Sequence, residues 1–441
     1  MSARPLIVIV DAGSTGTALP AAIAARAMDC FHVRSAESRG EIDAILGILA
    51  ADDARFVGGL DERTTDLAAM VTILEKLDVR GVVAGSEAGV DLSTTLAARL
   101  SVPGSGPSVP GLTRDKFQMT RRVAEAGLAT LPFRTVSSPS EAKDWWQETL
   151  GGASVVVKPL RDSGGNGVLF CHDWPAIEAA ITHLTAQSDL YGSPNHTVLV
   201  QKLAANAERI VEVCTVSADG AHRPMMILES SKVGPIYECM RLVHRDELAD
   251  YQDEIDYALS VLDALGVTMG AAFTEVIDEP GIGPVMIECN ARLIGGFLDS
   301  RFCSAALGHS QVALLADACT DPTAFVTTTP SAGSIQHARL VHLRSDTAGL
   351  LREDLSALEV LVRALPTRLA HRISVSAGDV LAETTDLSTS PGFVQLVGAD
   401  PAQVAADYHA IRSAEAGGIY RDAVAQGGPE EPHRSAPVMT P

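Results

Sequence analysis

Acid, amide and guanidinium side chains alternate in the stretch MIECNARLIGG, residues 286–296. Glu288, Asn290 and Arg292 occupy every second position, so in a β-strand they lie on one face. The preceding strand-like stretch AAFTEVID and the turn-like EPGIG predict a hairpin. A symmetric register about that turn places Glu275 opposite Glu288.

Two carboxylates that face each other across neighbouring strands repel, unless a cation lies between them. Glu275, Glu288 and Asn290 offer only oxygen ligands, which suit Mg²⁺ or Mn²⁺. Arg292 on the same face would neutralise an oxygen of a transferring phosphoryl group or of an acyl-phosphate. The alternative interpretation is a polar hairpin face held by surface ion pairs.

A glycine-rich loop follows a strand in ASVVVKPLRDSGGNGV, residues 153–168. The strand ends in Lys158, and the loop contains Ser163, Gly164, Gly165, Asn166 and Gly167. Glycines allow backbone N–H groups to converge on an anion, and Lys158 would reach phosphate oxygens as a point charge. The loop lacks the GK[ST] of a Walker A motif, and an ordinary turn is the alternative.

A strand also ends at Gln201, Lys202 and Leu203 in TVLVQKLAANAERIVEVCTV. After a short link, Glu208 leads into the next strand. The backbone of such a link would meet the edge of an adenine, and Glu208 would accept hydrogen bonds from ribose hydroxyls. The alternative is an ordinary connection with an exposed acid.

Composition limits the classes of protein to consider. A chain of 441 residues predicts two to four domains or subdomains, and its net charge of −21 argues against a nucleic-acid partner. No apolar run approaches the roughly 20 residues of a membrane span. The seven cysteines form no CxxC motif, which favours reduced thiols in a cytoplasmic protein.

The elements that must position these residues follow from the pattern of apolar residues. The N-terminal part predicts a small α/β domain with strands at 6–11, 31–34 and 80–84 and helices at 18–29 and 64–77. The turn GSTG lacks the spacing of a dinucleotide site, so we interpret it as a tight turn. SVPGSGPSVPG, residues 101–111, is the clearest linker.

The remaining elements predict mixed α/β and α+β structure. We expect a second α/β segment at 153–216, helices at 246–265, the hairpin at 271–290, and a C-terminal α+β unit whose last helix spans 402–415. The tail, 427–441, is predicted to be disordered.

Taken in order, these motifs resemble the ATP-grasp superfamily. The resemblance rests on Lys116 in RDK, Lys158 in VVVKP, and the stretches SGGNG, VQKLAANAE and FTEV…IECNARLIGG. It implies a Rossmann-like domain at 1–111, an ATP-grasp core at 112–323 with a mobile ATP-binding lid at about 153–203, and a C-terminal α+β domain at 324–426.

The resemblance also implies roles for these residues. Lys116, Lys158 and the glycine-rich loop would contact ATP phosphates or the adenine side, Gln201, Lys202 and Leu203 the adenine, and Glu208 the ribose. Glu275, Glu288 and Asn290 would hold Mg²⁺ or Mn²⁺, and Lys158 and Arg292 would be catalytic. In such enzymes a carboxylate attacks ATP to give an acyl-phosphate, and an amine then displaces phosphate.

Within the superfamily, the acid spacing and the stretches AGLATLPF and SPGFVQLVGAD look most like L-amino acid ligases, which join two amino acids, often in secondary metabolism. Those enzymes carry a Glu-x-x-His element at the amino-acid pocket. Here YECMRLVH presents Glu238 and, in the place of the histidine, Arg241. Arg241 would favour a substrate with an additional carboxylate, or would merely pair with Glu238.

Glu87, Gly295 and Gly296 are further candidates at the substrate site, with helix capping as the alternative for Glu87.

The leading hypothesis is therefore an ATP- and Mg²⁺-dependent carboxylate–amine ligase acting on amino acids or small acids. An ATP-grasp carboxylase or formate-using ligase is the first alternative, and a non-catalytic nucleotide-binding module is the second. The resemblance also implies a homodimer, because homodimers are common in the superfamily.

Overall fold

The structure is a computed structural model. It describes residues 4–38, 47–50, 52–105, 111–204, 209–233, 236–295, 298–328, 330–387, 389–421 and 424. Glu208, Gly296 and the tail at 427–441 lie outside the described residues. Among the described helices, none is both long and apolar enough to cross a membrane.

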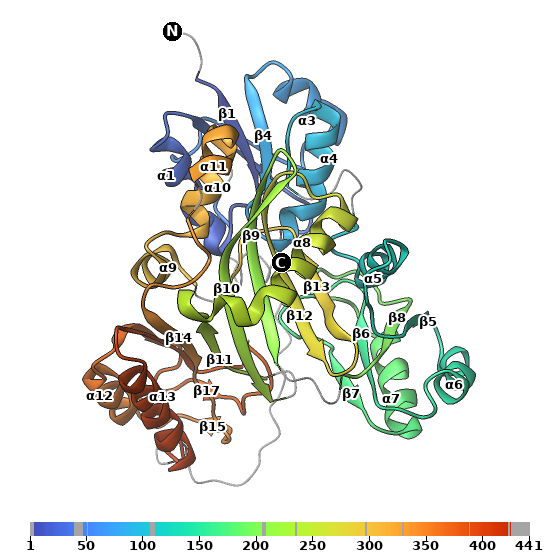
Figure 1. The fold of residues 1–441 in the computed structure, drawn as a ribbon, viewed down its shortest axis with the longest axis vertical. Helices are drawn as coiled ribbons and strands as arrows, with labels where there is room; N and C mark the ends of the chain where they lie inside the picture. Colours follow the sequence, from blue (N-terminus) through green and yellow to red (C-terminus); the bar gives the residue numbers. More distant parts are fainter. Residues whose placement is uncertain are drawn as a thin grey trace, which may run out of the picture.

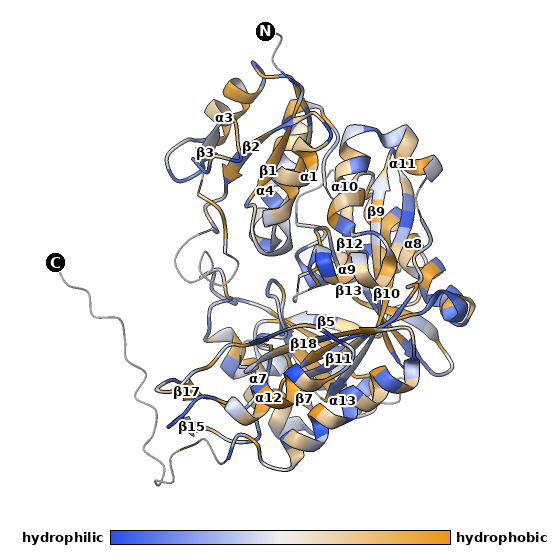
Figure 2. Cartoon of the chain, turned by 90° about the vertical axis from the view of Figure 1, so that its left-hand side faces the viewer, coloured by the Kyte–Doolittle hydropathy of each residue, from blue (hydrophilic) through white to orange (hydrophobic). Residues whose placement is uncertain are grey.

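The N-terminal unit is a parallel sheet with the order β3-β2-β1-β4 (Figure 1). Its elements are β1 (Leu6–Val10), the 3₁₀ turn η1 (Ser14–Ala18), α1 (Leu19–Ala24), β2 (Asp29–Arg34), β3 (Gly59–Asp61), α3 (Leu67–Leu74), β4 (Val79–Ala84), η2 (Glu87–Gly89) and α4 (Val90–Leu100). Every residue of β1 is buried, and the strand is coloured as hydrophobic in Figure 2. The predicted helix at 18–29 is shorter, because Ala27 adopts a left-handed backbone conformation with φ 61°.

Two glycines pack backbone to backbone at the carboxyl ends of β1 and β4. These strands border the point where the strand order reverses, and open α/β sheets usually bind ligands there. A Cβ atom on Gly16 would lie 2.0 Å from the carbonyl oxygen of Gly85. The backbone therefore fills the crevice, which agrees with the interpretation of GSTG as a tight turn.

The central sheet has eight strands, in the order β13-β12-β9-β10-β11-β14-β18-β16. They are β9 (Ile210–Ala218), β10 (Ala221–Val233), β11 (Ile236–Leu242), β12 (Gly270–Glu279), β13 (Gly283–Asn290), β14 (His337–His342), β16 (Arg368–Ile373) and β18 (Gly392–Gly398). Three strands from the predicted C-terminal unit thus extend the central sheet. The rest of that unit is the pair β15 (Gly349–Leu350) and β17 (Val380–Leu381) with α12 (Ser356–Ala364) and α13 (Pro401–Ala416).

A separate four-stranded sheet, β5-β8-β6-β7, forms the unit on the right of Figure 1. We call it the lid unit; it comprises β5 (Phe133–Val136), α6 (Pro139–Glu148), β6 (Val155–Pro159), β7 (Leu169–Cys171), α7 (Trp174–Thr185) and β8 (Val198–Lys202). Because β5 pairs with β8, the unit begins before residue 153, the predicted start of the lid.

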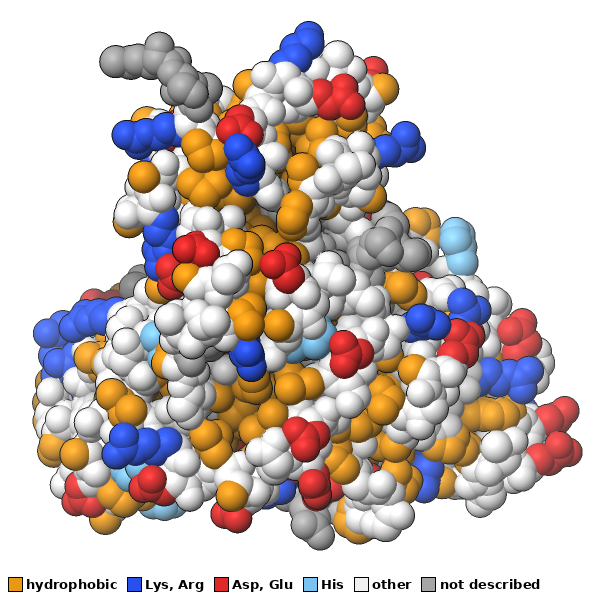
Figure 3. All heavy atoms as spheres, turned by 45° about the horizontal axis from the view of Figure 1, so that its top comes forward, with side chains coloured by type: hydrophobic (Ala, Val, Ile, Leu, Met, Phe, Trp, Pro, Cys, Tyr) orange, Lys and Arg blue, Asp and Glu red, His pale blue; other side chains and the backbone are white. Residues whose placement is uncertain are grey.

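Helices connect these layers. They are α5 (Lys116–Glu125), η3 (Arg245–Tyr251), α8 (Gln252–Leu265), α9 (Ser300–Leu307), α10 (Gln311–Thr320) and α11 (Pro322–Thr328). The buried faces of α5 and α8 pack under the β12–β13 hairpin, while α10 shares an apolar cluster with β1 and α1. Among the described residues on the face drawn in Figure 3, Lys and Arg side chains are interspersed with Asp and Glu.

The contact between Gly16 and Gly85 predicts a stability effect. In Gly16→Ala the new methyl group meets backbone that must shift, which should lower the free energy of unfolding by roughly 1–3 kcal/mol. Urea denaturation measures this loss. Gly417→Ala is the control, because Gly417 is exposed at a helix end with φ −70°, and the expected change is within about 0.5 kcal/mol. Equal losses in both variants would contradict the prediction.

Candidate functional site

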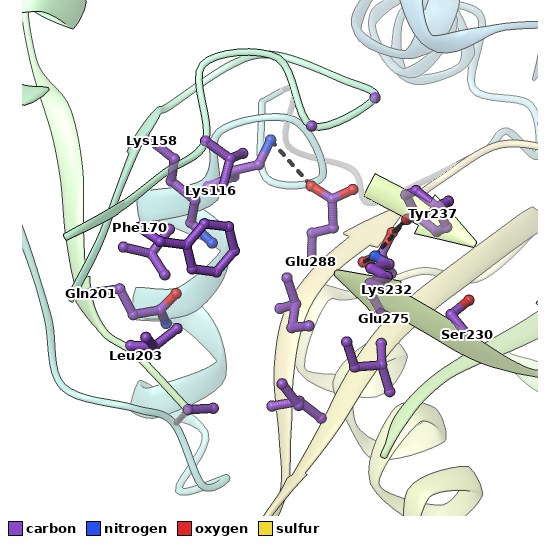
Figure 4. Close-up of a pocket in the computed structure, with 18 of the residues that line it drawn as sticks. Lys116, Lys158, Phe170, Gln201, Leu203, Ser230, Lys232, Tyr237, Glu275 and Glu288 are labelled. Atoms are coloured by element: carbon purple, nitrogen blue, oxygen red, sulfur yellow. Dashed lines mark hydrogen bonds and ion pairs between the residues drawn. The ribbon is translucent and has the colours of Figure 1, made fainter. Parts of the chain in front are cut away.

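A cavity of about 670 Å³ lies between the lid unit and the central sheet. Figure 4 shows side chains of the lid unit on one side and those of the central sheet on the other. Its apolar lining comes from both sides: Leu131, Val156, Phe170, Leu203, Ile277 and Ile287. The rest of the lining is dominated by lysines, glutamates and the glycine-rich loop. The cavity therefore combines a slot for a flat apolar ring with a charged end.

An acidic row crosses three strands of the central sheet at the charged end. Glu275 pairs directly with Glu288 across the hairpin, as predicted, but the register is not symmetric about the turn: a β-bulge between Glu275 and Val276 shifts the pairing by one residue, so that Glu288 and not Ile287 lies opposite Glu275. On its other side Glu275 pairs with Glu212 of β9. Glu212 is only 2% exposed and was not predicted from the sequence. The three side chains form the acidic row, and their proximity requires positive charge nearby.

Lysines from two elements supply that charge. Lys116, the first residue of α5, lies 3.1 Å from Glu288, and Lys232 of β10 lies 3.2 Å from Glu275 (Figure 4). Burial would raise the pKa of Glu288, but Lys116 and the amide of Asn290 outweigh it and lower that pKa. Burial and then the charge of Glu275 raise the pKa of Glu212 to about 7.

The oxygen donors at the charged end fit a hard divalent cation whose remaining ligands come from a bound substrate. Glu275 and Glu288 provide carboxylate oxygens, and Asn290 donates through Nδ2 to Glu288 Oε1 at 2.9 Å, which leaves its own oxygen available. Within the described part of the chain, no three His, Cys, Asp or Glu side chains converge into a complete metal site. Strands about 4.8 Å apart spread the acids along a row, so further oxygen ligands must come from elsewhere.

Lys158 is the strongest indication of an anionic ligand. It lies at the end of β6, is only 5% exposed and lines the cavity. Among the described residues, its ammonium group has no hydrogen-bond or ion-pair partner. Burial and then the neighbouring Lys116 lower its pKa to about 8. A buried cation without a partner indicates a negatively charged ligand in this cavity.

The glycine-rich loop adopts the conformation that its sequence predicts. Gly164, Gly165 and Gly167 all have positive φ, at 67°, 81° and 68°. A Cβ on Gly167 would also lie 2.8 Å from the ring of Pro159, so a larger residue does not fit there. The loop stays close to Lys116, because the ammonium of Lys116 donates to the Asp162 carbonyl at 2.8 Å.

The residues predicted to contact adenine all line the cavity: Gln201, Lys202 and Leu203. Figure 4 shows Gln201 and Leu203 on the side of the lid unit. However, the Leu203 amide donates to the Ser154 carbonyl at 2.9 Å, so this backbone donor is already used. Leu203 therefore offers its apolar side chain, and not its backbone N–H, to a ligand in the cavity.

Arg292 lies outside the lining of the cavity, beside the N-terminal unit. Its Nε donates to Glu87 Oε2 at 2.6 Å, and its guanidinium group lies 5.0 Å from the ring centre of Phe273. A Cβ on Gly295 would approach Ser14 Oγ at 3.4 Å, so this predicted residue also lies against the N-terminal unit. The structure thus brings Arg292, Glu87 and Gly295 together.

Arg241 and Glu238 do not form the predicted pair. Arg241 instead lies 2.6 Å from Glu229 and 2.7 Å from Glu247, whereas Glu238 pairs with Arg344. Neither residue lines the cavity. The interpretation that Arg241 merely pairs with Glu238 is therefore wrong.

Strand alternation explains the separation of Arg241 from the acidic row. Met240 and Leu242 pack in the same apolar cluster as Phe273. Phe273 precedes Glu275 by two residues, so it shares a face of β12 with the acidic row. Arg241 lies between Met240 and Leu242 and therefore faces the opposite side of the sheet.

Sequence reasoning also missed two residues beside Glu275. Lys232 donates to the hydroxyl of Tyr237 at 2.6 Å, and that hydroxyl donates to Glu275 at 3.1 Å. The only sequence signal for Glu212 is a lone acid within the apolar run IVEVCTV. Lys232 and Tyr237 carry no comparable signal, because their place beside Glu275 depends on pairing between distant strands.

Comparison with known proteins places the fold. No family model matches the sequence. Dapdiamide A synthase of Enterobacter agglomerans is 28% identical over 428 residues, covering 94% of this chain and 96% of that protein. The solved structure of an L-amino acid ligase from Bacillus licheniformis matches with a TM-score of 0.71 at 17% identity, covering 94% of this chain and 98% of that chain. A carboxyaminoimidazole ribonucleotide synthase from Aspergillus clavatus, complexed with ATP, matches with a TM-score of 0.68 at 14% identity and the same coverage of each chain.

Glu212 predicts an unusual gain in stability. The pKa of Glu212 in the folded state, about 7, exceeds the ordinary value of 4.5 for a glutamate, so its ionised form destabilises the fold progressively as pH rises from 4.5 and fully above pH 7. Without divalent ions at pH 8, Glu212→Gln should raise the free energy of unfolding by roughly 1–2 kcal/mol. Chemical denaturation measures the change, with Glu148→Gln, at an exposed position, as the control. A less stable Glu212→Gln would contradict the repulsion within the acidic row.

Proposed function

This chain has the ATP-grasp fold that its sequence predicts, and we propose that it is an ATP-dependent carboxylate–amine ligase. It would form an amide bond between two amino acids, or between an amino acid and a small acid, and release ADP and phosphate. The observation that carries the proposal is the charged end of the cavity. There Lys158, which has no hydrogen-bond or ion-pair partner among the described residues, lies close to the paired acids Glu275 and Glu288.

The cavity suits ATP in one orientation. The adenine ring fits the apolar slot beside Leu203, and the triphosphate extends toward Lys158, Lys116 and the glycine-rich loop. The complex with ATP of a structure with the same fold supports nucleotide use. Glu275, Glu288 and Asn290 would hold Mg²⁺, which neutralises and orients phosphate oxygens when bound.

The first step makes an acyl-phosphate. An oxygen of the substrate carboxylate attacks the γ-phosphorus of ATP, the bond from that phosphorus to the bridging oxygen breaks, and ADP leaves with the electron pair. Lys158 and Lys116 offset the negative charge that develops on the phosphate oxygens. Positioning and charge neutralisation are the protein's main contributions to this step.

The second step makes the amide bond. The nitrogen of the acceptor amine attacks the acyl carbon, the bond from that carbon to the phosphate oxygen breaks, and the amine proton passes to solvent. Arg292, two residues beyond Asn290, would stabilise the tetrahedral intermediate and the departing phosphate with its positive charge. Its stacking on Phe273 and its bond to Glu87 fix the guanidinium group in place.

Two of the similar proteins support different candidate reactions. The similarity to dapdiamide A synthase extends over nearly the whole chain and favours an amide-forming ligase of secondary metabolism. The likeness to a carboxyaminoimidazole ribonucleotide synthase is one of fold at 14% identity, and an ATP-grasp carboxylase is the second candidate function. We place the amide ligase first, because the first similarity is also one of sequence.

A screen of ATP-dependent phosphate release tests the proposal. Pairs of amino acids and small acids, together with bicarbonate and formate, are incubated with Mg²⁺ and ATP. We expect release with particular amino-acid pairs, with an amide product of matching mass. Glu288→Gln should lower the rate at least 100-fold, because it removes one of the facing carboxylates. Release with bicarbonate alone would favour the carboxylase, and tight ATP binding without release from any mixture would overturn both.

The ion pairs of Arg161 lead to a prediction about how much acyl-phosphate is converted to amide rather than hydrolysed by water. It follows β6 in the lid unit and pairs with Glu37 at 3.3 Å and with Asp91 of the N-terminal unit. These pairs hold the glycine-rich loop over the site, so their loss should admit water to the acyl-phosphate. In Arg161→Ala the ratio of phosphate released to amide formed should rise from about one to at least three. Arg134→Ala, an exposed change on β5, is the control and should keep a ratio of about one. A ratio of one in both variants would contradict the role of Arg161.

A homodimer is the remaining part of the proposal. Sedimentation analysis at micromolar concentration should show twice the mass of the chain. A single species with the mass of one chain would contradict it.

A further inference from the structure

Glu87 is a buried carboxylate shared by two arginines from different parts of the chain. It lies in η2, directly after β4 of the N-terminal unit, and its side chain is 8% exposed. Its Oε2 accepts from Arg292 Nε at 2.6 Å, and its Oε1 accepts from Arg114 Nε at 3.2 Å. Both oxygens are therefore occupied by guanidinium groups, which leaves little room for a substrate ammonium group.

Arg292 depends on this contact for its position. It lies beyond the end of β13, so no strand pairing fixes its backbone. Its other polar contact is Nη1 to the carbonyl of the adjacent Leu293, at 3.0 Å. Among the described residues, Glu87 is the only acid within ion-pair distance of Arg292. The stacking on Phe273 restrains the plane of the guanidinium group but gives it no fixed direction.

Glu87 itself is held from the other side by Arg114. Arg114 also pairs with Glu37 at 2.6 Å, and its guanidinium group lies 4.6 Å from the ring centre of Tyr191 in the lid unit. Tyr191 packs against Ala88, the residue after Glu87. The capping alternative fails, because η2 has Ser86 at its N-cap and no side-chain cap hydrogen bond.

We propose that Glu87 is a positioning residue for the ligase reaction: it aims the guanidinium group of Arg292 and affects the chemistry only through Arg292. The inference rests on the proposed function for the role of Arg292. It replaces the earlier expectation that Glu87 contacts the substrate. It also links the lid unit to the reacting groups, since Tyr191 and Arg114 hold Glu87 where Arg292 needs it.

A double-mutant cycle tests the proposal, with Glu87→Gln, Arg292→Met and the two combined. Each single change should lower kcat for ATP-dependent phosphate release at least tenfold, because misplacement of a reacting group by about 1 Å can cost 100-fold. KM for ATP should change by less than threefold, because neither residue lines the nucleotide cavity. The double variant should be no slower than Arg292→Met alone. A further tenfold loss in the double variant would mean that Glu87 acts independently of Arg292, which overturns the proposal.

Glu415→Gln is a matched control for general destabilisation. Glu415 is also 8% exposed and pairs with an arginine, Arg412, that is 15% exposed, compared with 16% for Arg292. It lies in α13, away from the cavity. We expect Glu415→Gln and Glu87→Gln to lose similar stability in urea, but only Glu87→Gln to lose kcat. An equal loss of kcat in both variants would overturn the positioning role.

A crystal structure of Glu87→Gln separates this inference from the proposed function. If the unmodified protein releases no phosphate with any acceptor, the proposed function fails, whereas the structure still decides whether Glu87 aims Arg292. We expect the guanidinium group of Arg292 to leave its place over Phe273 in the variant. An unchanged position would overturn the inference even in an active enzyme.

Discussion

The direct pairing of Glu275 with Glu288 is the constraint on which the site depends. Two carboxylates held side by side in a buried hairpin are stable only where positive charge approaches them. That charge comes from Lys116 of α5 and Lys232 of β10, while Lys158 of the lid unit lies nearby and has no ion-pair partner in the part of the chain that the structure describes. The hairpin, a helix and the lid unit therefore converge on one point, and the cavity is the space that they enclose. A polyanionic substrate and its metal ion would complete the balance of charge.

How much the sequence predicts depends on how local the interaction is. The turn EPGIG fixes the hairpin, and the glycines fix the loop after Lys158. The pairing of Glu275 with Glu288 also needs the β-bulge between Glu275 and Val276, which the turn does not determine. Glu212 was missed because its contact with Glu275 comes from β9, about 60 residues earlier, and no local pattern identifies the neighbour of a hairpin in a sheet. The contact of Glu87 with Arg292 spans 205 residues and lies beyond any spacing rule.

The extent of each sheet has the same origin. The sequence predicts a C-terminal α+β unit, but nothing in it says that β14, β16 and β18 extend the central sheet rather than form one of their own. Likewise, β5 was separated from the predicted lid because only its pairing with β8 places it there.

Arg241 shows that the face of a strand on which a side chain lies is also hard to predict. Its type suggested carboxylate recognition, but its position between Met240 and Leu242 turns it to the opposite face from the acidic row. Nearby residues determine whether a segment is a helix or a strand, but distant contacts determine which sheet a strand joins and which of its faces meets the site.

The overall charge of −21 repels a polyphosphate at long range, but the distance between charges decides how strongly each one acts. Exposed charges farther apart than about 10 Å are largely screened at physiological salt, whereas buried pairs are not. Arg292, Arg114 and Arg161 each have an acid within 4 Å, whereas Lys158, which lines the cavity, has no hydrogen-bond or ion-pair partner among the described residues. The net charge therefore bears on how fast an anionic substrate approaches, while the affinity and the geometry of binding depend on a few buried groups. This is also why a single buried carboxylate such as Glu87, outside the lining of the cavity, could control the placement of a reacting group.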